Sequence, residues 1–191
     1  MRRTAALSRE QPTTDEDLRA ILDVCDYLIG RAGRTTAVMA LRGSRAQRVL
    51  QFQVEHSHGY GYYAGVPEAE VLSRIDALIA EKILCLEYRE GFPLLVYSRD
   101  GLAIAQRYAA ENWLGVLRSR IQPIAAGAPL DLPFLMSQMP NRSLDTLHLL
   151  TDLVAREANP SWLPLLRAWQ AVETRRVRSW LAPILTALEQ A

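Results

Sequence analysis

Five arginines lie between Gly30 and Val54, and no acidic residue lies among them. They are Arg31, Arg34, Arg42, Arg45 and Arg48. Guanidinium groups bind phosphate oxygens through paired hydrogen bonds, so this cluster is suited to a polyanionic ligand; the alternative is a solvated, arginine-rich surface. The whole chain holds 22 basic and 21 acidic residues, so the positive excess is local and the net charge alone predicts no polyanionic partner.

The densest part of this cluster is the run Arg42-Gly43-Ser44-Arg45. Gly43 can adopt a left-handed conformation, and Ser44 can begin the following helix. We expect the backbone amides at that helix start, the serine hydroxyl and the flanking guanidiniums to converge on a phosphate oxygen. The predicted phosphate-binding residues are Arg34, Arg42, Gly43, Ser44, Arg45 and Arg48.

A second set of candidate contacts is aromatic. Phe92 lies at the tip of a predicted β-hairpin, and Tyr88 and Arg89 come just before the turn. A ring at a hairpin tip has no core to enter, so it either stacks on the end of a duplex or folds back over the hairpin. His56 and Tyr60, in a loop rich in glycine and tyrosine, are further candidate contacts or half-buried packing residues.

Apolar periodicity and capping signals predict the elements that position these residues. The expected helices span 13–29, 36–41, 44–52, 70–83 and 99–120, and the expected strands span 83–88 and 94–98. The first helix has a capping-box pattern at Thr13 and Glu16. In a winged helix, several helices are followed by a two-stranded ribbon, and the expected elements have this order. We therefore predict an α+β, mostly helical fold with a β-hairpin wing.

The predicted organisation has four parts. They are a flexible arm (1–12), a winged-helix domain (13–120), a linker rich in proline and glycine (121–142) and a C-terminal helical region (143–191). Ser143 is expected to cap a helix, and Pro183 to kink or break the last one. The tryptophans and leucines of this region either pack on each other or on the winged helix, or form a surface for a homodimer or another partner.

Several short motifs resemble the signature of the RQC domain, the winged-helix module that follows the ATPase core of RecQ-type DNA helicases. They are Gly33-Arg34-Thr35, Leu41-Arg42-Gly43-Ser44, Gln47-Arg48, His56-Ser57 and Tyr60-Gly61, within a resemblance that spans about residues 15–110. The resemblance implies that Arg42, Ser44 and Arg48 bind backbone phosphates and that Phe92 contacts a duplex end. It also implies double-stranded or branched DNA as the partner, in repair, recombination or replication.

Other functional classes find little support in the sequence. The phosphate-binding run Gly-x-x-x-x-Gly-Lys-Ser/Thr does not occur, so we expect a free-standing RQC domain without ATP-driven unwinding. No catalytic motif is recognisable, and we expect a protein that is not an enzyme and needs no cofactor. Cys25 and Cys85 lack the spacing of a zinc site, so no metal is expected.

No apolar run approaches the roughly 20 residues of a membrane span, and the first residues do not form a secretory signal. We therefore expect a cytoplasmic protein without a membrane partner. Two alternatives stay open. One is a protein-interaction or dimerisation module that meets a second copy, a helicase or a nuclease through its C-terminal helices. The other is a winged-helix transcription regulator.

Overall fold

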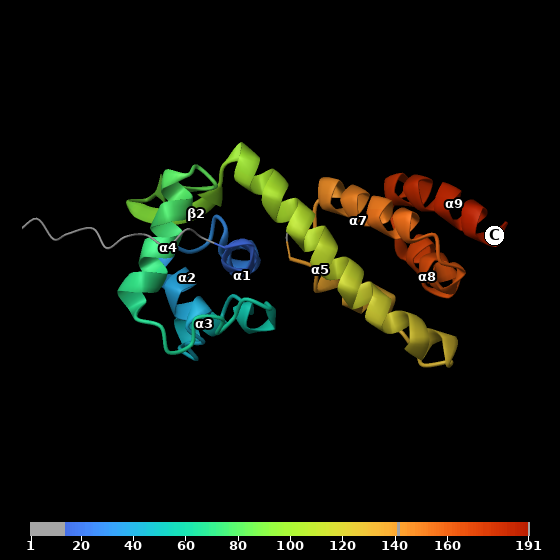
Figure 1. The fold of residues 1–191 in the computed structure, drawn as a ribbon, viewed down its shortest axis with the longest axis horizontal. Coiled ribbons are helices and arrows are strands. Elements are labelled where there is room, and N and C mark those ends of the chain that lie inside the picture. The colour runs from blue at the N-terminus through green and yellow to red at the C-terminus, as the bar shows by residue number, and fades with distance from the viewer. Residues whose placement is uncertain (1–13, 141, 191) are drawn as a thin grey trace, which may run out of the picture. The chain divides into compact units, whose positions relative to one another are not determined.

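The computed structural model describes residues 14–140 and 142–190 (Figure 1). The arm predicted for residues 1–12 lies outside the described residues. The chain forms two compact units, one ending at Ser98 and one beginning at Arg99. None of the described helices combines the length and the apolar character that a membrane span requires.

The first unit is a winged helix. Its elements are α1 (Asp15–Leu28), α2 (Arg34–Leu41), α3 (Gln47–Leu50), the 3₁₀ turn η1 (Val54–His56), α4 (Glu68–Ala80), β1 (Leu84–Arg89) and β2 (Phe92–Tyr97). Fully buried apolar side chains from α1, α2, α4 and the hairpin form its core, among them Ile21, Leu41, Ile75 and Leu95. The described residues are 66% helical and include one two-stranded antiparallel hairpin, which confirms the predicted fold class.

Helix α1 begins one residue later than the sequence predicted. Its capping box pairs Thr14 with Asp17, whose backbone amide donates to the threonine hydroxyl at 3.0 Å, so the prediction of Thr13 and Glu16 is wrong. Asp17 is only 5% exposed because its carboxylate also accepts a hydrogen bond from Tyr63 and pairs with Arg74 at 2.9 Å. These partners come from distant segments, so local sequence did not reveal which of the two overlapping boxes forms.

The hairpin is tighter than predicted. Its turn holds only Glu90 and Gly91, whose φ angles of 53° and 83° are both positive, as a type I′ turn requires. The paired strands consequently extend to the tip, where Arg89 lies opposite Phe92 and Tyr88 lies opposite Pro93.

The second unit is entirely helical within the described residues. It contains α5 (Arg99–Ala125), α6 (Leu132–Ser137), α7 (Leu144–Glu157), the 3₁₀ turn η2 (Pro160–Trp162), α8 (Leu163–Val172) and α9 (Arg175–Glu189). Trp162 and Trp169 are fully buried in a core that also includes residues of α5, so the C-terminal helices pack on each other and on that helix. The predicted boundary at residue 120 falls within α5.

In this unit, Ser143 caps a helix as predicted, and Pro183 does not break one. Ser143 caps α7 as expected, because its hydroxyl accepts from the Thr146 amide at 3.1 Å. Pro183 does not break α9, which continues through it to Glu189. The predicted linker 121–142, of which Asn141 lies outside the described residues, contains the end of α5 and all of α6.

Candidate nucleic-acid interface

The Arg42-Gly43-Ser44 turn closes α2. The amides of Arg42, Gly43 and Ser44 donate to carbonyl oxygens in the last turns of α2 at 3.0, 2.9 and 2.9 Å. Gly43 adopts the predicted left-handed conformation, with φ at 75°. The prediction that these amides face an anion is wrong, because the unpaired carbonyls at a helix C-terminus use them first.

Ser44 does not begin the next helix either. Helix α3 starts at Gln47, after Ala46, and it ends at Leu50 instead of extending from residue 44 to 52. The Ser44 hydroxyl accepts a hydrogen bond from the Ala46 amide, with 3.4 Å between oxygen and nitrogen. Because both residues precede α3, this bond stabilises the turn and does not cap a helix. The turn therefore offers side chains to a ligand, while its backbone is committed to α2.

The loop after η1 braces this turn. Gly43 and Gly61 approach so closely that a Cβ on Gly43 would lie 3.3 Å from the Gly61 Cα. The amides of Gly61 and Tyr63 donate to the carbonyls of the last two residues of α2 at 3.0 and 2.8 Å. Tyr60 is half-buried, and its hydroxyl donates to the Ser44 carbonyl at 3.1 Å. His56 is exposed at the end of η1.

The predicted arginines differ in how far the protein itself uses them. Arg34 forms an ion pair with Asp76 of α4. Arg42 is 37% exposed; its Nε donates to the Val66 carbonyl at 2.9 Å, and one Nη lies 3.7 Å from the Glu68 carboxylate.

Arg45 and Arg48 are exposed. Among residues 14–140 and 142–190, neither guanidinium has a carboxylate or aromatic partner. Arg31, also exposed, lies with its guanidinium carbon 4.9 Å from the centre of the Phe52 ring. The turn and the start of α3 thus carry two cationic side chains that nothing in the described fold neutralises.

The wing tip carries the predicted aromatic side chains into solvent. Tyr88 and Phe92 are each 70% exposed, so Phe92 does not fold back over the hairpin. Opposite residues in a paired ribbon share a face and neighbours alternate, so these two rings lie on opposite faces. Arg89 shares the face of Phe92 and donates to Glu87 at 3.1 Å.

The family model of the RQC domain matches residues 10–110, which is more than half of the chain. The chain belongs to the RQC family. The RQC domain is a DNA-binding winged-helix domain of RecQ helicases and is not catalytic by itself. This confirms the resemblance drawn from the sequence. Comparisons with curated proteins and with solved structures gave no match.

In this RQC domain, α2 separates the arginine-bearing turn from the wing. Gly33, just before α2, lies against the hairpin so closely that a Cβ there would be 2.5 Å from the Pro93 carbonyl oxygen. Arg42 lies at the other end of the helix. The eight residues of α2 give it a length of about 12 Å, which sets the scale of the separation.

Sequence reasoning missed the network that holds the loop after η1 in place. Burial tends to raise the pKa of Asp17, but hydrogen bonds from Tyr63 and Thr14 and the charge of Arg74 lower it below its ordinary value of 3.8. The bonded residues Tyr63 and Arg74 lie 46 and 57 positions from Asp17, so no local motif could have indicated them. Gly59 belongs to the same loop, and its amide donates to Asp23 at 3.1 Å.

Proposed function

We propose that this chain binds the sugar–phosphate backbone of double-stranded or branched DNA through the side chains of the turn between α2 and α3. Arg42, Ser44, Arg45 and Arg48 hold the phosphates. The observation that carries the proposal is the pair Arg45 and Arg48, exposed and without carboxylate partners among the described residues. Exposed guanidiniums of this kind form strong, charge-assisted hydrogen bonds with phosphate.

The two other arginines of the predicted site have different parts. The Val66 carbonyl takes the Nε hydrogen of Arg42 and orients the group, which leaves its Nη atoms to meet a phosphate in competition with Glu68. Arg34 is engaged by Asp76, so its role is mainly to join α2 to α4. The backbone amides of the turn take no part, because α2 already uses them.

We propose that the wing contacts the end of a duplex, a fork or a junction. Tyr88 and Phe92 place aromatic surface in solvent at a tight tip, and aromatic rings stack on bases regardless of sequence. The separation of about 12 Å along α2 equals the rise of about three to four base pairs at about 3.4 Å each. The arginines would therefore hold the backbone a few base pairs from the end that the wing meets.

Recognition by this arrangement favours DNA structure over sequence, because the contacts go to phosphate and to a ring face. Helix α4 supports this view, since its only arginine, Arg74, is held by Asp17 and Glu70 and cannot also read base edges. We therefore rank the transcription-regulator alternative lower, and we propose a non-enzymatic role in repair, recombination or replication.

A binding panel tests the proposal. Fluorescence anisotropy with the full chain should give tighter binding to a fork and to a blunt duplex than to a covalently closed duplex circle, with single strands weakest. Binding should weaken steeply with salt. Equal affinity for single strands and duplexes would contradict backbone recognition of a duplex. Equal affinity for forks and closed circles would contradict the proposed end contact of the wing and would leave the phosphate-binding turn unaffected.

A further inference from the structure

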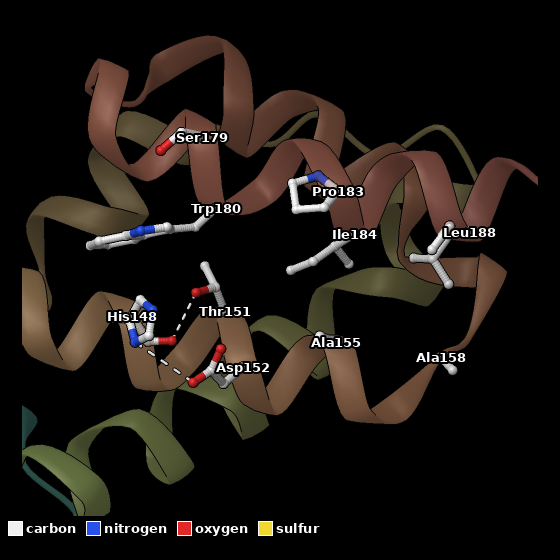
Figure 2. A pocket seen from close by; sticks show the side chains of 11 residues that line it. His148, Thr151, Asp152, Ala155, Ala158, Ser179, Trp180, Pro183, Ile184 and Leu188 are labelled. Atoms are coloured by element: carbon white, nitrogen blue, oxygen red, sulfur yellow. Dashed lines mark hydrogen bonds and ion pairs between the residues drawn. The ribbon is translucent and has the colours of Figure 1, made fainter.

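The second unit contains a groove between α7 and α9. The two helices lie side by side and run in the same direction, and residues of both line a cavity of about 490 Å³ (Figure 2). Its apolar lining is mostly on α9, with Trp180, Pro183, Ile184 and Leu188, and opposite them lie Ala155 of α7 and Ala158, which follows that helix. The small side chains of α7 opposite the larger ones of α9 leave the room for an occupant.

This groove borders the core of the unit. The core includes Leu150 and Val154 of α7 and Val177 and Leu181 of α9, all completely buried, together with Leu188 at the groove itself. Trp180 and Ile184 pack against this core and are only partly buried, so the α9 wall of the groove is an edge of the core that stays open to solvent. Apolar strips that stay open to solvent on a stable framework are typical of protein-binding surfaces.

The acidic group of the groove is Asp152, and none of the described lining residues is a lysine or an arginine. The nearby cation Arg176 is not among them; its guanidinium carbon lies 5.7 Å from the centre of the Trp180 ring. The His148 ring lies 3.6 Å from the Asp152 carboxylate, and it meets the Trp180 ring edge to face at 4.7 Å between centres. These contacts close one end of the groove, as Figure 2 shows.

The opposite end of the groove is also electronegative. Helix α7 ends there at Glu157 and is followed by Ala158 in a left-handed conformation with φ at 46°, and α9 approaches its own C-terminus at Leu188 (Figure 2). Helix C-termini carry partial negative charge. Nearer the His148 end, Pro183 has no amide hydrogen, so the Ser179 carbonyl lacks its usual helical donor.

We propose that this groove docks an amphipathic helix of a partner protein, with the apolar face inward and a lysine or arginine directed at Asp152. The lining extends from His148 to Ala158 along α7, about 15 Å at helical rise, which matches two to three turns of a docked helix. Apolar side chains at i, i+3 or i+4, and i+7 would fill such a groove.

Charge and shape argue against other occupants. A nucleic acid would bring phosphates toward Asp152 and toward two helix C-termini, where negative charge is disfavoured. A second copy would present the same concave surface if it used the same face, as a symmetric dimer does, and two hollows do not fill one another.

Two synthetic helical peptides of about 18 residues provide the probe. Both carry leucines at i, i+3, i+4 and i+7; one has arginines beside the leucine face, and the other has glutamates at those positions. Circular dichroism first establishes that the two peptides are equally helical. Binding of fluorescein-labelled peptide to the full chain is then followed by anisotropy.

The arginine peptide should bind about tenfold more tightly than the glutamate peptide. Ala155→Arg should abolish binding by filling the groove and opposing the cation, whereas Ala182→Arg, on an exposed position of α9 outside the lining, should not. Asp152→Asn should remove most of the preference for arginine while some binding persists.

Three results would overturn the proposal. One is equal affinity for the two peptides, and another is binding of the arginine peptide that Ala155→Arg leaves unchanged. The third is a dimer of the full chain, seen by sedimentation, that Ala155→Arg dissociates and Ala182→Arg does not; the occupant would then be a second copy. Folding of each variant is checked by its thermal transition, and the exposure of Ala155 and Ala182 makes both substitutions tolerable.

Discussion

Removing Arg45 and Arg48 together is the most direct test of the phosphate-binding turn. Both side chains are exposed and make no ion pair within the described residues, so alanine substitution should leave the stability of the fold unchanged. An exposed guanidinium–phosphate contact contributes about 1 kcal/mol. Losing two such contacts should weaken duplex binding by about 30-fold. The loss should be the same for every duplex sequence.

The salt dependence of duplex binding gives an independent measure of how many phosphate contacts the double variant loses. Each phosphate contact contributes about 0.9 to the slope of log K against log salt concentration for duplex DNA, so the double variant should lower the slope by about 1.8. Anisotropy titrations of one duplex at several salt concentrations measure both the affinity and the slope. A weaker affinity with an unchanged slope would indicate damage to the fold and not loss of phosphate contacts.

A charge-matched control separates local contacts from net charge. Replacing Arg120 and Arg156 with alanine also removes two exposed arginines, and either double variant changes the formal net charge from +1 to −1. The control should bind duplex DNA within about twofold of the natural chain, since long-range charge is screened at physiological salt. If both double variants lose affinity equally, the turn has no special part in binding, and the proposed interface is refuted.

Three further predictions concern the wing, the arginine of the turn and the buried carboxylate. Phe92→Ala should weaken binding to forks and duplex ends about tenfold, consistent with one stacked ring, and leave closed circular duplex unaffected; equal losses in anisotropy assays would argue against an end contact. Glu68→Gln should tighten duplex binding about twofold to threefold by releasing the Arg42 Nη group that lies 3.7 Å away, and weaker binding would show that the acid orients the arginine instead of competing for it. Asp17→Asn should lower the free energy of unfolding at pH 7 by about 2 kcal/mol, because the buried carboxylate serves Tyr63 as acceptor. The pKa of Asp17 is lowered in the folded state, so its contribution to the free energy of unfolding is present above the ordinary pKa of 3.8 and is lost as pH falls through the lowered pKa. Urea titrations should therefore give free energies of unfolding for the natural chain and the variant that converge at acid pH. A difference between them that stays constant with pH would contradict this assignment.

Local sequence was sufficient for the main elements of the winged helix and for the family, although it missed α6 and overextended α3. Apolar periodicity indicated the longer helices, in which apolar residues recur every third or fourth position, and the hairpin followed from two apolar segments around a glycine-containing turn. The left-handed conformation of Gly43 could be predicted, because glycine adopts a positive φ more readily than other residues. The motif Leu41-Arg42-Gly43-Ser44 with Gln47-Arg48 is enough to indicate the RQC domain, and the family model confirms it.

The hydrogen-bond and ion-pair partners of the polar groups could not be predicted from local sequence. Counting charges did not distinguish among the four arginines of the predicted site, yet Arg34 is paired with a carboxylate 42 positions away and Arg42 with a carbonyl 24 positions away. The amides of the turn were predicted to face a ligand, but the C-terminus of α2 takes them. Nothing in the local sequence encodes such pairings.

The sequence by itself therefore determined a winged helix of the RQC family with an excess of arginine around one turn. Only the tertiary structure decided which of those arginines remain available, which capping box starts α1, and that the wing rings stay in solvent. The reason is physical. Periodicity and backbone conformation are properties of neighbouring residues, whereas hydrogen bonds and ion pairs depend on which distant segments folding brings within about 3 Å of each other.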